Sequence, residues 1–149
     1  MRAVVDTNVW VSAILNPAGY PARVLQAYRD GRFTLVISTP LLAELREVLL
    51  RPRMARKYGV TAEDADELTQ LLGIRALVMP VVGAVKLCRD PDDDVVLETA
   101  LRARAGALVS RDEDLTRAED LTELLAEGGV AVLSVARLLR RLDAEAPAE

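Results

Sequence analysis

Acidic residues follow several strand-like stretches of this sequence, and they are the side chains best suited to chemistry. Asp6 comes directly after the apolar stretch Arg2–Val5, and Glu44 lies in the segment STPLLAELREVL. Asp112 comes two residues after the run ALVS, with Asp114 close behind. The segment RDPDDDVV supplies four more acids, namely Asp90, Asp92, Asp93 and Asp94. Four separate parts of the chain therefore provide carboxylates.

The rest of the composition narrows the chemistry that these carboxylates could perform. The chain has no histidine and a single cysteine, Cys88. This excludes Ser-His-Asp and Cys-His nucleophile pairs, a Cys/His zinc site and an intramolecular disulfide. The hard ions Mg²⁺ and Mn²⁺ are the partners that carboxylate oxygens suit best. Such a site activates water and stabilises charge on a phosphodiester without any histidine.

Alternating strand and helix patterns would bring these acids to one edge of a sheet. The expected strands are Arg2–Val5, Phe33–Ser38, Ile74–Val81, Ala107–Ser110 and Val130–Ser134. The expected helices are Ala22–Arg29, Pro40–Leu50, Ala62–Leu72, Val95–Arg104, Ala118–Glu127 and Val135–Leu142. This order predicts an α/β fold with a mainly parallel sheet covered on both faces. Ligands of such sheets bind outside the carboxyl ends of the strands, where the acids fall.

Carboxylates that lie close together repel one another, and this repulsion must be offset by protonation or by a cation. Two like charges about 4 Å apart repel by roughly 4 kcal/mol at an effective dielectric constant of about 20. Either some of the acids are protonated or a divalent cation binds between them. The second possibility predicts a site for Mg²⁺ or Mn²⁺.

Each acid also has a simpler explanation. Asp6 could cap a helix, while Thr7 and Asn8 could be turn residues or could orient Asp6. Glu44 could lie on an exposed helix face, although the leucines around it tilt it toward the buried side. The DPDDD run could be a solvated turn or could favour the positive end of a helix dipole. The acids after ALVS could cap a turn.

Bulk properties predict a single globular domain. The chain has 149 residues, of which 51% are hydrophobic and 28% charged, with a net charge of −4. We expect residues 1–142 to form the domain and residues 143–149 a flexible tail. No apolar run reaches the roughly 18–20 residues of a membrane helix, and the start lacks the regions of a signal peptide. We therefore expect a cytoplasmic protein.

Three segments together resemble a known family. They are VVDTNVWVSAIL, STPLLAELREVL and CRDPDDDVVLETALRARAGALVSRDEDL, in this order. The set resembles PIN-domain nucleases and, more narrowly, the VapC-like toxins of bacterial toxin–antitoxin systems. The resemblance extends from Met1 to about Leu139. It implies a three-layer α/β/α sandwich and divalent-metal-dependent RNA cleavage that leaves 5′-phosphate and 3′-hydroxyl ends.

The resemblance also implies roles for individual residues. Asp6 matches the first metal-binding acid of the family, Glu44 the second and Asp112 the fourth. Ser110 matches a small hydroxyl residue two positions before the last acid. Asn8 matches an asparagine that supports the site by hydrogen bonding.

The third metal-binding acid has two candidates. Asp94 lies eighteen residues before Asp112, a spacing found in many VapC-like toxins. Closer relatives read DPDDN here, which makes Asp93 the match and is the alternative we favour. This chain reads DDDVV in place of a DDNKF-like stretch, and SRDEDL in place of TGDKDL. Neither change removes a ligand, so they bear on substrate contacts.

Partners follow from the same resemblance. It implies an RNA substrate, a cognate antitoxin protein and a homodimer or higher homo-oligomer. The densest run of basic residues comprises Arg51, Arg53, Arg56 and Lys57. It is either an ordinary solvated turn or, together with Arg46, a surface that binds RNA phosphates. The aromatic residues Trp10, Tyr20 and Tyr28 are expected in the core or at a dimer interface.

Two other classes of protein also gather acids at strand ends. A dehalogenase-like phosphatase needs DxD after the first strand, whereas the third position here is Asn8. A receiver domain needs two adjacent acids near the N-terminus and a lysine after a late strand, and both are missing from the expected places. A non-catalytic PIN-like module that binds RNA or protein remains the alternative.

Overall fold

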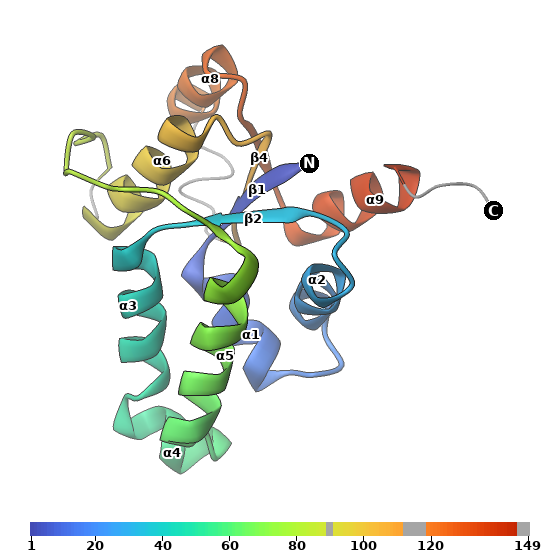
Figure 1. Ribbon diagram of the computed structural model, residues 1–149, viewed down its shortest axis with the longest axis vertical. Helices are drawn as coiled ribbons and strands as arrows, with labels where there is room; N and C mark the ends of the chain where they lie inside the picture. The colour runs from blue at the N-terminus through green and yellow to red at the C-terminus, as the bar shows by residue number, and fades with distance from the viewer. Residues whose placement is uncertain (89–90, 112–118, 146–149) are drawn as a thin grey trace.

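A five-stranded parallel sheet forms the centre of the molecule (Figure 1). The computed structural model describes residues 1–88, 91–111 and 119–145. The strand order is β3-β2-β1-β4-β5, and every neighbouring pair is parallel. The strands are β1 (Arg2–Val5), β2 (Thr34–Ile37), β3 (Leu77–Val78), β4 (Ala107–Val109) and β5 (Ala131–Leu133).

Helices cover both faces of this sheet. In Figure 1, α6 and α8 lie above the strands, and α1, α2, α3 and α5 lie below them. The helices are α1 (Thr7–Leu15), α2 (Tyr20–Arg29), α3 (Thr39–Leu49), α4 (Pro52–Tyr58), α5 (Ala62–Arg75), α6 (Pro91–Ala103), α8 (Glu119–Glu127) and α9 (Val135–Glu145). This arrangement confirms the expected three-layer α/β/α sandwich.

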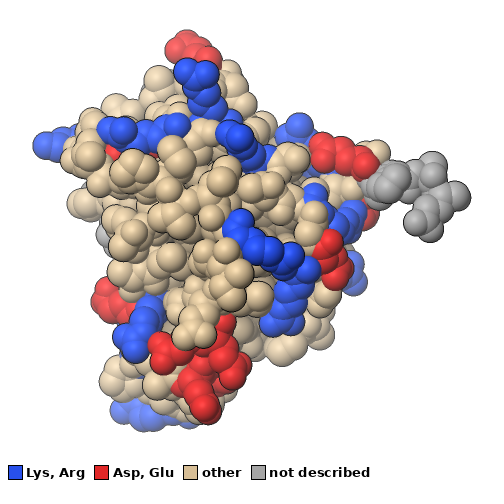
Figure 2. Space-filling model, in the orientation of Figure 1, with Lys and Arg blue, Asp and Glu red and all other residues tan. Residues whose placement is uncertain are grey.

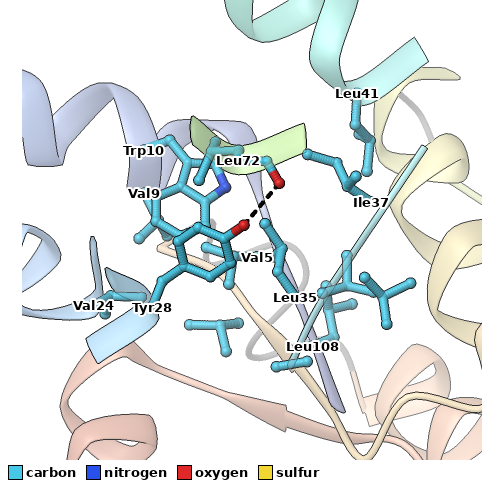
Figure 3. Packing of buried hydrophobic residues seen from close by; sticks show 14 of the residues in the cluster. Val5, Val9, Trp10, Val24, Tyr28, Leu35, Ile37, Leu41, Leu72 and Leu108 are labelled. Carbon is cyan, nitrogen blue, oxygen red and sulfur yellow. Dashed lines mark hydrogen bonds between the residues drawn. The ribbon is translucent and has the colours of Figure 1, made fainter. Parts of the chain in front are cut away.

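The core is built mainly from aliphatic side chains of the strands and of the helix faces that meet them. Leu35 on β2 and Leu108 on β4, the two strands on either side of β1, are fully buried. Trp10 packs edge-on against Tyr28, with 6.4 Å between ring centroids. The Tyr28 hydroxyl donates to the carbonyl oxygen of Leu72 at 3.0 Å (Figure 3). Trp10 and Tyr28 thus belong to the core, whereas Tyr20 is exposed.

The structure differs from the sequence prediction in three elements. α1 begins directly after Asp6, although the strand and helix patterns do not predict it. α4 takes the place of the expected turn, because Pro52 suits a first helical turn and Gly59, at φ 68°, ends the helix. The expected strand Ile74–Val81 was wrong in extent: Ile74 and Arg75 end α5, and only Leu77–Val78 pair with β2.

Other element boundaries shift by a few residues. The expected domain end at residue 142 lies inside α9, which continues to Glu145. Two residues after helices have a positive φ, Arg104 at 50° after α6 and Gly129 at 82° after α8. Within the described ranges, no helix combines the length and the apolar character that crossing a bilayer requires.

Candidate functional site

Strand register places four polar residues in one row. Val5 pairs with Val109, Val4 with Val36, and Val109 with Leu133. One position beyond the end of each strand, the sequence has Ser38, Asp6, Ser110 and Ser134, in the order β2, β1, β4 and β5. We call these four residues the polar row. The row lies at the carboxyl ends of the strands, where parallel sheets bind ligands.

Asp6 stands at the centre of this row and is held by its neighbour. Its backbone N–H donates to the Val109 carbonyl at 2.8 Å, which continues the β1–β4 pairing by one residue. The Ser110 hydroxyl donates to Asp6 Oδ2 at 2.9 Å, and both side chains are buried. Asp6 occupies the N-cap position of α1, yet its side chain makes no capping hydrogen bond. Helix capping therefore does not explain this acid.

A second contact connects the start of α1 to α3. The hydroxyl of Thr7, which is buried, donates to Glu44 Oε2 at 3.2 Å. Glu44 is partly buried, and Leu41 and Leu45 beside it on α3 are buried against the core. The Glu44 side chain is thus directed to the β1–α1 junction rather than to solvent. Asp6 belongs to this junction, and Glu44 accepts a hydrogen bond from the next residue, Thr7, so both acids lie at the start of α1.

Asn8 carries a buried acceptor near this junction. Its side-chain oxygen Oδ1 has no hydrogen-bond partner among the residues that the structure describes. A buried acceptor without a donor costs free energy, on the order of 1–3 kcal/mol. The position therefore suits an additional donor such as a water molecule.

Helix α6 presents its consecutive acids in different directions. Asp93 lies three, four and seven positions before Val96, Leu97 and Ala100, all of which are buried. Residues at these spacings share one face of a helix, so Asp93 lies on the face that packs on the sheet. Contacts of α6 with β1 and β2 agree with this direction.

Asp94 instead holds the segment before α6. Its Oδ1 accepts hydrogen bonds from the backbone N–H groups of Leu87 and Cys88, both at 2.8 Å. Burial raises the pKa of Asp94, but the hydrogen bonds from Leu87 and Cys88 lower it by more than burial raises it. The pKa of Asp94 therefore lies below its ordinary value. Of the two candidates for the third acid, Asp94 is committed to backbone contacts.

Glu98 is a buried acid with several hydrogen-bond donors, and the sequence analysis did not identify it as a candidate. It lies one turn after Asp94 and is 2% exposed. Its carboxylate accepts from the N–H groups of Val82, Ala84 and Val85 at 2.7, 2.6 and 3.3 Å, and from Arg102 Nε at 2.9 Å. Burial raises its pKa, but these donors outweigh burial and lower it. The position of Glu98 within the otherwise mostly apolar helix segment VVLETAL was the feature of the sequence that could have predicted its burial.

A hydroxyl pair joins β2 to α6, and it was also missed. Ser38 Oγ lies 3.1 Å from Thr99 Oγ1, and both residues are fully buried. Thr99 Oγ1 also donates to the Val95 carbonyl at 2.7 Å. Ser38 belongs to the polar row, so this contact connects the middle of α6 to the strand ends.

Part of the expected site lies outside the described residues. These positions are Asp90, Asp112 and Asp114. In the described part of the chain, no three Asp, Glu or Cys side chains are grouped closely enough to hold a metal ion. What the described residues bring together is Asp6 with Ser110, and Thr7 with Glu44.

The expected basic surface lies away from the polar row. Figure 1 shows α4 at the far end of α3 from the strands. Arg46 pairs with Asp66 at 2.9 Å, and Arg51 lies 3.6 Å from Glu47. Figure 2 shows acidic residues gathered near this end of the molecule. Arg53, Arg56 and Lys57 are exposed on α4, and their contact with RNA stays a prediction.

Comparison with known proteins places this geometry in a family. A model of the PIN domain matches residues 2–114, which include Asp6, Glu44, Asp93 and Ser110 but not Ser134 of the polar row. The chain belongs to the PIN domain family. Outside this match lie α8, β5 and α9, so the last strand of the sheet is not part of the matched region.

Relatives of this PIN domain include one curated protein and several solved structures. An uncharacterized protein of Methanocaldococcus jannaschii, MJ1680, is 26% identical over 125 residues, which is 84% of this chain and 79% of that protein. A chain of VapBC2 from Rickettsia felis, solved with a promoter DNA fragment, has a TM-score of 0.60 at 16% identity. The alignment covers 90% of this chain and 98% of that one.

A second structural relative comes from Neisseria gonorrhoeae. The FitAcB structure gives a TM-score of 0.57 at 19% identity, covering 89% of this chain and 97% of the matched chain. At these identities the likeness establishes the fold. The likeness therefore agrees with the three-layer sandwich of this chain.

Proposed function

We propose that this PIN domain is a divalent-metal-dependent endoribonuclease and the toxin of a toxin–antitoxin pair. The observation that carries the proposal is the burial and the hydrogen bonding of Asp6. This carboxylate is buried at the end of the central strand, is oriented by Ser110 and does not cap the helix that it precedes. Burying a carboxylate without a helix-capping role is costly and is typical of functional sites.

The side chains present fit a hard cation. Asp6, Glu44 and Asp93 offer oxygen donors only, which is the ligand set that Mg²⁺ and Mn²⁺ prefer. The buried Asn8 Oδ1 supplies an acceptor suited to a water molecule of a hydrated ion. We assign Asp6, Glu44, Asp93 and Asp112 as ligands, and we leave Asp94 out because it binds backbone N–H groups.

Residues of this chain prepare the site for RNA cleavage. A bound Mg²⁺ or Mn²⁺ supplies activation of water and stabilisation of negative charge on the phosphate. Ser110 holds one oxygen of Asp6 in place, and Thr7 does the same for Glu44. These hydroxyl donors limit the rotation of each carboxylate, as partners of metal ligands do in other sites.

The toxin assignment rests on the family resemblance and on the fold shared with VapBC2 and FitAcB chains. The VapBC2 structure was solved bound to a DNA fragment from its promoter. By analogy, this chain would be held by a cognate antitoxin and would form a homodimer or higher homo-oligomer. A short reading frame next to the gene, whose product co-purifies with this chain, would support the assignment.

The central test is cleavage of a labelled RNA with and without Mg²⁺ or Mn²⁺. We expect cleavage that chelation abolishes. Asp6→Asn keeps the shape of the side chain but removes its charge, and it should lower the rate at least about a hundredfold, because even residues behind metal ligands are worth 10–100-fold. Asp30→Asn, an exposed substitution at the end of α2, is the matched control and should cleave like the wild type.

Two results would count against the proposal. Cleavage by Asp6→Asn at the wild-type rate would eliminate this site as the source of activity. Wild-type protein that binds RNA but does not cut it with either metal would favour the non-catalytic PIN-like module. A single-stranded DNA of the same sequence, tested in parallel, measures the preference for RNA.

A further inference from the structure

Helix α9 and the edge strand β5 enclose a groove outside the residues matched by the PIN domain model. The groove has a volume of about 410 Å³ and is lined by Ala131, Leu133, Arg137, Arg140, Arg141 and Ala144. Its floor is apolar and its wall on α9 carries three arginines. All three arginines are exposed, and none of them forms an ion pair with another described residue.

The arginines share one face of α9 because of their spacing. Arg140 and Arg141 follow Arg137 by three and four residues, which places them on adjacent turns of the same side. The opposite face of α9 is buried through Leu138 and Leu142. The helix is therefore fixed on the molecule by its apolar face and presents a line of guanidinium groups about 5–6 Å long.

The helix that forms one wall of this groove begins directly after the polar row. Ser134 is the row's member after β5, and its hydroxyl accepts from the backbone N–H of Arg137 at 3.2 Å. On the neighbouring strand, Ser110 donates its N–H to the Leu133 carbonyl at 3.1 Å and its hydroxyl to Asp6. Two strand spacings of about 4.8 Å separate Asp6 from Ser134, so the first arginine stands within roughly 10–15 Å of the site.

Local charge distinguishes this surface from the basic run on α4. The helix beside α4 carries the acids Glu63, Asp64, Asp66 and Glu67, which offset its positive charge. α9 carries two acids, Asp143, which pairs with Arg32 at 3.1 Å, and Glu145 at its last position, and neither of them lines the groove. The groove therefore keeps a local positive charge on a chain whose net charge is −4.

We propose that single-stranded RNA runs from the acidic site along this groove, with its phosphates bound by Arg137, Arg140 and Arg141. This inference rests on the proposed ribonuclease function and names a binding path for its substrate. Guanidinium groups bind phosphate oxygens in a bidentate manner, and Ala131 and Leu133 offer an apolar floor to a ribose or base. An extended acidic peptide is a weaker fit, because β5 has three residues and offers few backbone hydrogen bonds.

The test is RNA binding in an Asp6→Asn background, measured by fluorescence anisotropy of a labelled single-stranded RNA at several salt concentrations. Substituting Arg137→Gln, Arg140→Gln and Arg141→Gln together should raise Kd at least about tenfold at low salt. The slope of log K against log salt should fall by about 2, since each lost phosphate contact is worth about 0.7. The same number of substitutions on α4, Arg53→Gln, Arg56→Gln and Lys57→Gln, should change Kd less than about twofold.

The outcomes separate this inference from the proposed function. A wild type that cleaves RNA, together with an α9 variant of unchanged Kd and salt slope, overturns the groove and leaves the nuclease intact. Equal weakening by the α4 and α9 variants also overturns it, since charge alone would then explain binding. If the α9 variant keeps RNA binding but loses binding to a poly-glutamate peptide, the groove takes an acidic peptide instead. Thermal melting of each variant verifies that it is folded.

Discussion

At the scale of single residues, the candidate site depends on the hydrogen-bond partners of each acidic side chain. Asp6 accepts from a serine on the adjacent strand, and Glu44 accepts from a threonine on α1. Asp93 and Asp94 are adjacent in sequence but differ in surroundings, because successive helix residues point about 100° apart. One faces the sheet, while the other binds two backbone N–H groups.

This difference predicts opposite effects for the same substitution. Asp93→Asn should remove most RNA cleavage, because it removes the charge of a proposed metal ligand. Asp94→Asn should lower the melting temperature, because its charged hydrogen bonds to Leu87 and Cys88 weaken, and it should keep cleavage at a temperature where the variant is folded. The two variants serve as controls for each other in paired activity and melting measurements. An inactive but fully stable Asp94→Asn would reverse the assignment of the third ligand.

At the scale of elements, α6 organises the segment that precedes it. Asp94 and Glu98 lie one turn apart on the same side of the helix, and together they bind N–H groups between residues 82 and 88. Ser38 and Thr99 connect the same helix to the end of β2. The position of Asp93 therefore depends on contacts made by its neighbours along α6.

Glu98→Gln tests this arrangement through the pH dependence of stability. The pKa of Glu98 is lowered from the ordinary value of 4.5, so its charge contributes stability above about pH 4.5, and that contribution is lost as the pH falls through the lower folded pKa. At pH 7 the variant should lose about 2 kcal/mol of unfolding free energy, since charged hydrogen bonds are worth about 1.5–3 kcal/mol each. Urea unfolding at several pH values measures this.

The difference between Glu98→Gln and the wild type should shrink below pH 4.5. Glu123→Gln, an exposed substitution on α8, should leave stability unchanged at every pH. A Glu98→Gln protein as stable as the wild type at pH 7 would contradict the role assigned to this carboxylate.

At the scale of the whole molecule, one aliphatic core joins the three layers, and few polar contacts cross it. Tyr28 makes one of these, with its hydroxyl 3.0 Å from the carbonyl oxygens of both Leu71 and Leu72. This contact connects α2 to the end of α5 across more than forty residues of sequence (Figure 3). The charged surfaces lie outside the core, and the α9 groove and the α4 run are separate parts of it.

Tyr28→Phe should therefore lower the global stability by about 1 kcal/mol, the usual net value of one hydrogen bond. The ring contacts with Trp10 and Phe33 remain in this variant, so the effect reports the hydroxyl alone. Tyr20→Phe is the matched control, because Tyr20 is 59% exposed and should show almost no change. Urea unfolding followed by circular dichroism gives both values, and equal stability of the two variants would show that the hydroxyl bond contributes little.

The sequence by itself determined the α/β class, the main strands and the position of Asp6 at a strand end. These follow from local patterns, since a buried parallel strand is an apolar run and its end is marked by the first polar residue. The segment at Ile74–Val81 was misjudged for the same reason, because an apolar run does not distinguish a strand from the last turn of a helix.

Only the tertiary structure decided how distant residues combine. Strand register placed Ser110 beside Asp6, helix phase separated Asp93 from Asp94, and chain packing buried Glu98 against the backbone of an earlier segment. The groove between α9 and β5 likewise exists only once the last strand joins the sheet. Such contacts depend on the relative placement of elements, and no local pattern in the chain encodes that placement.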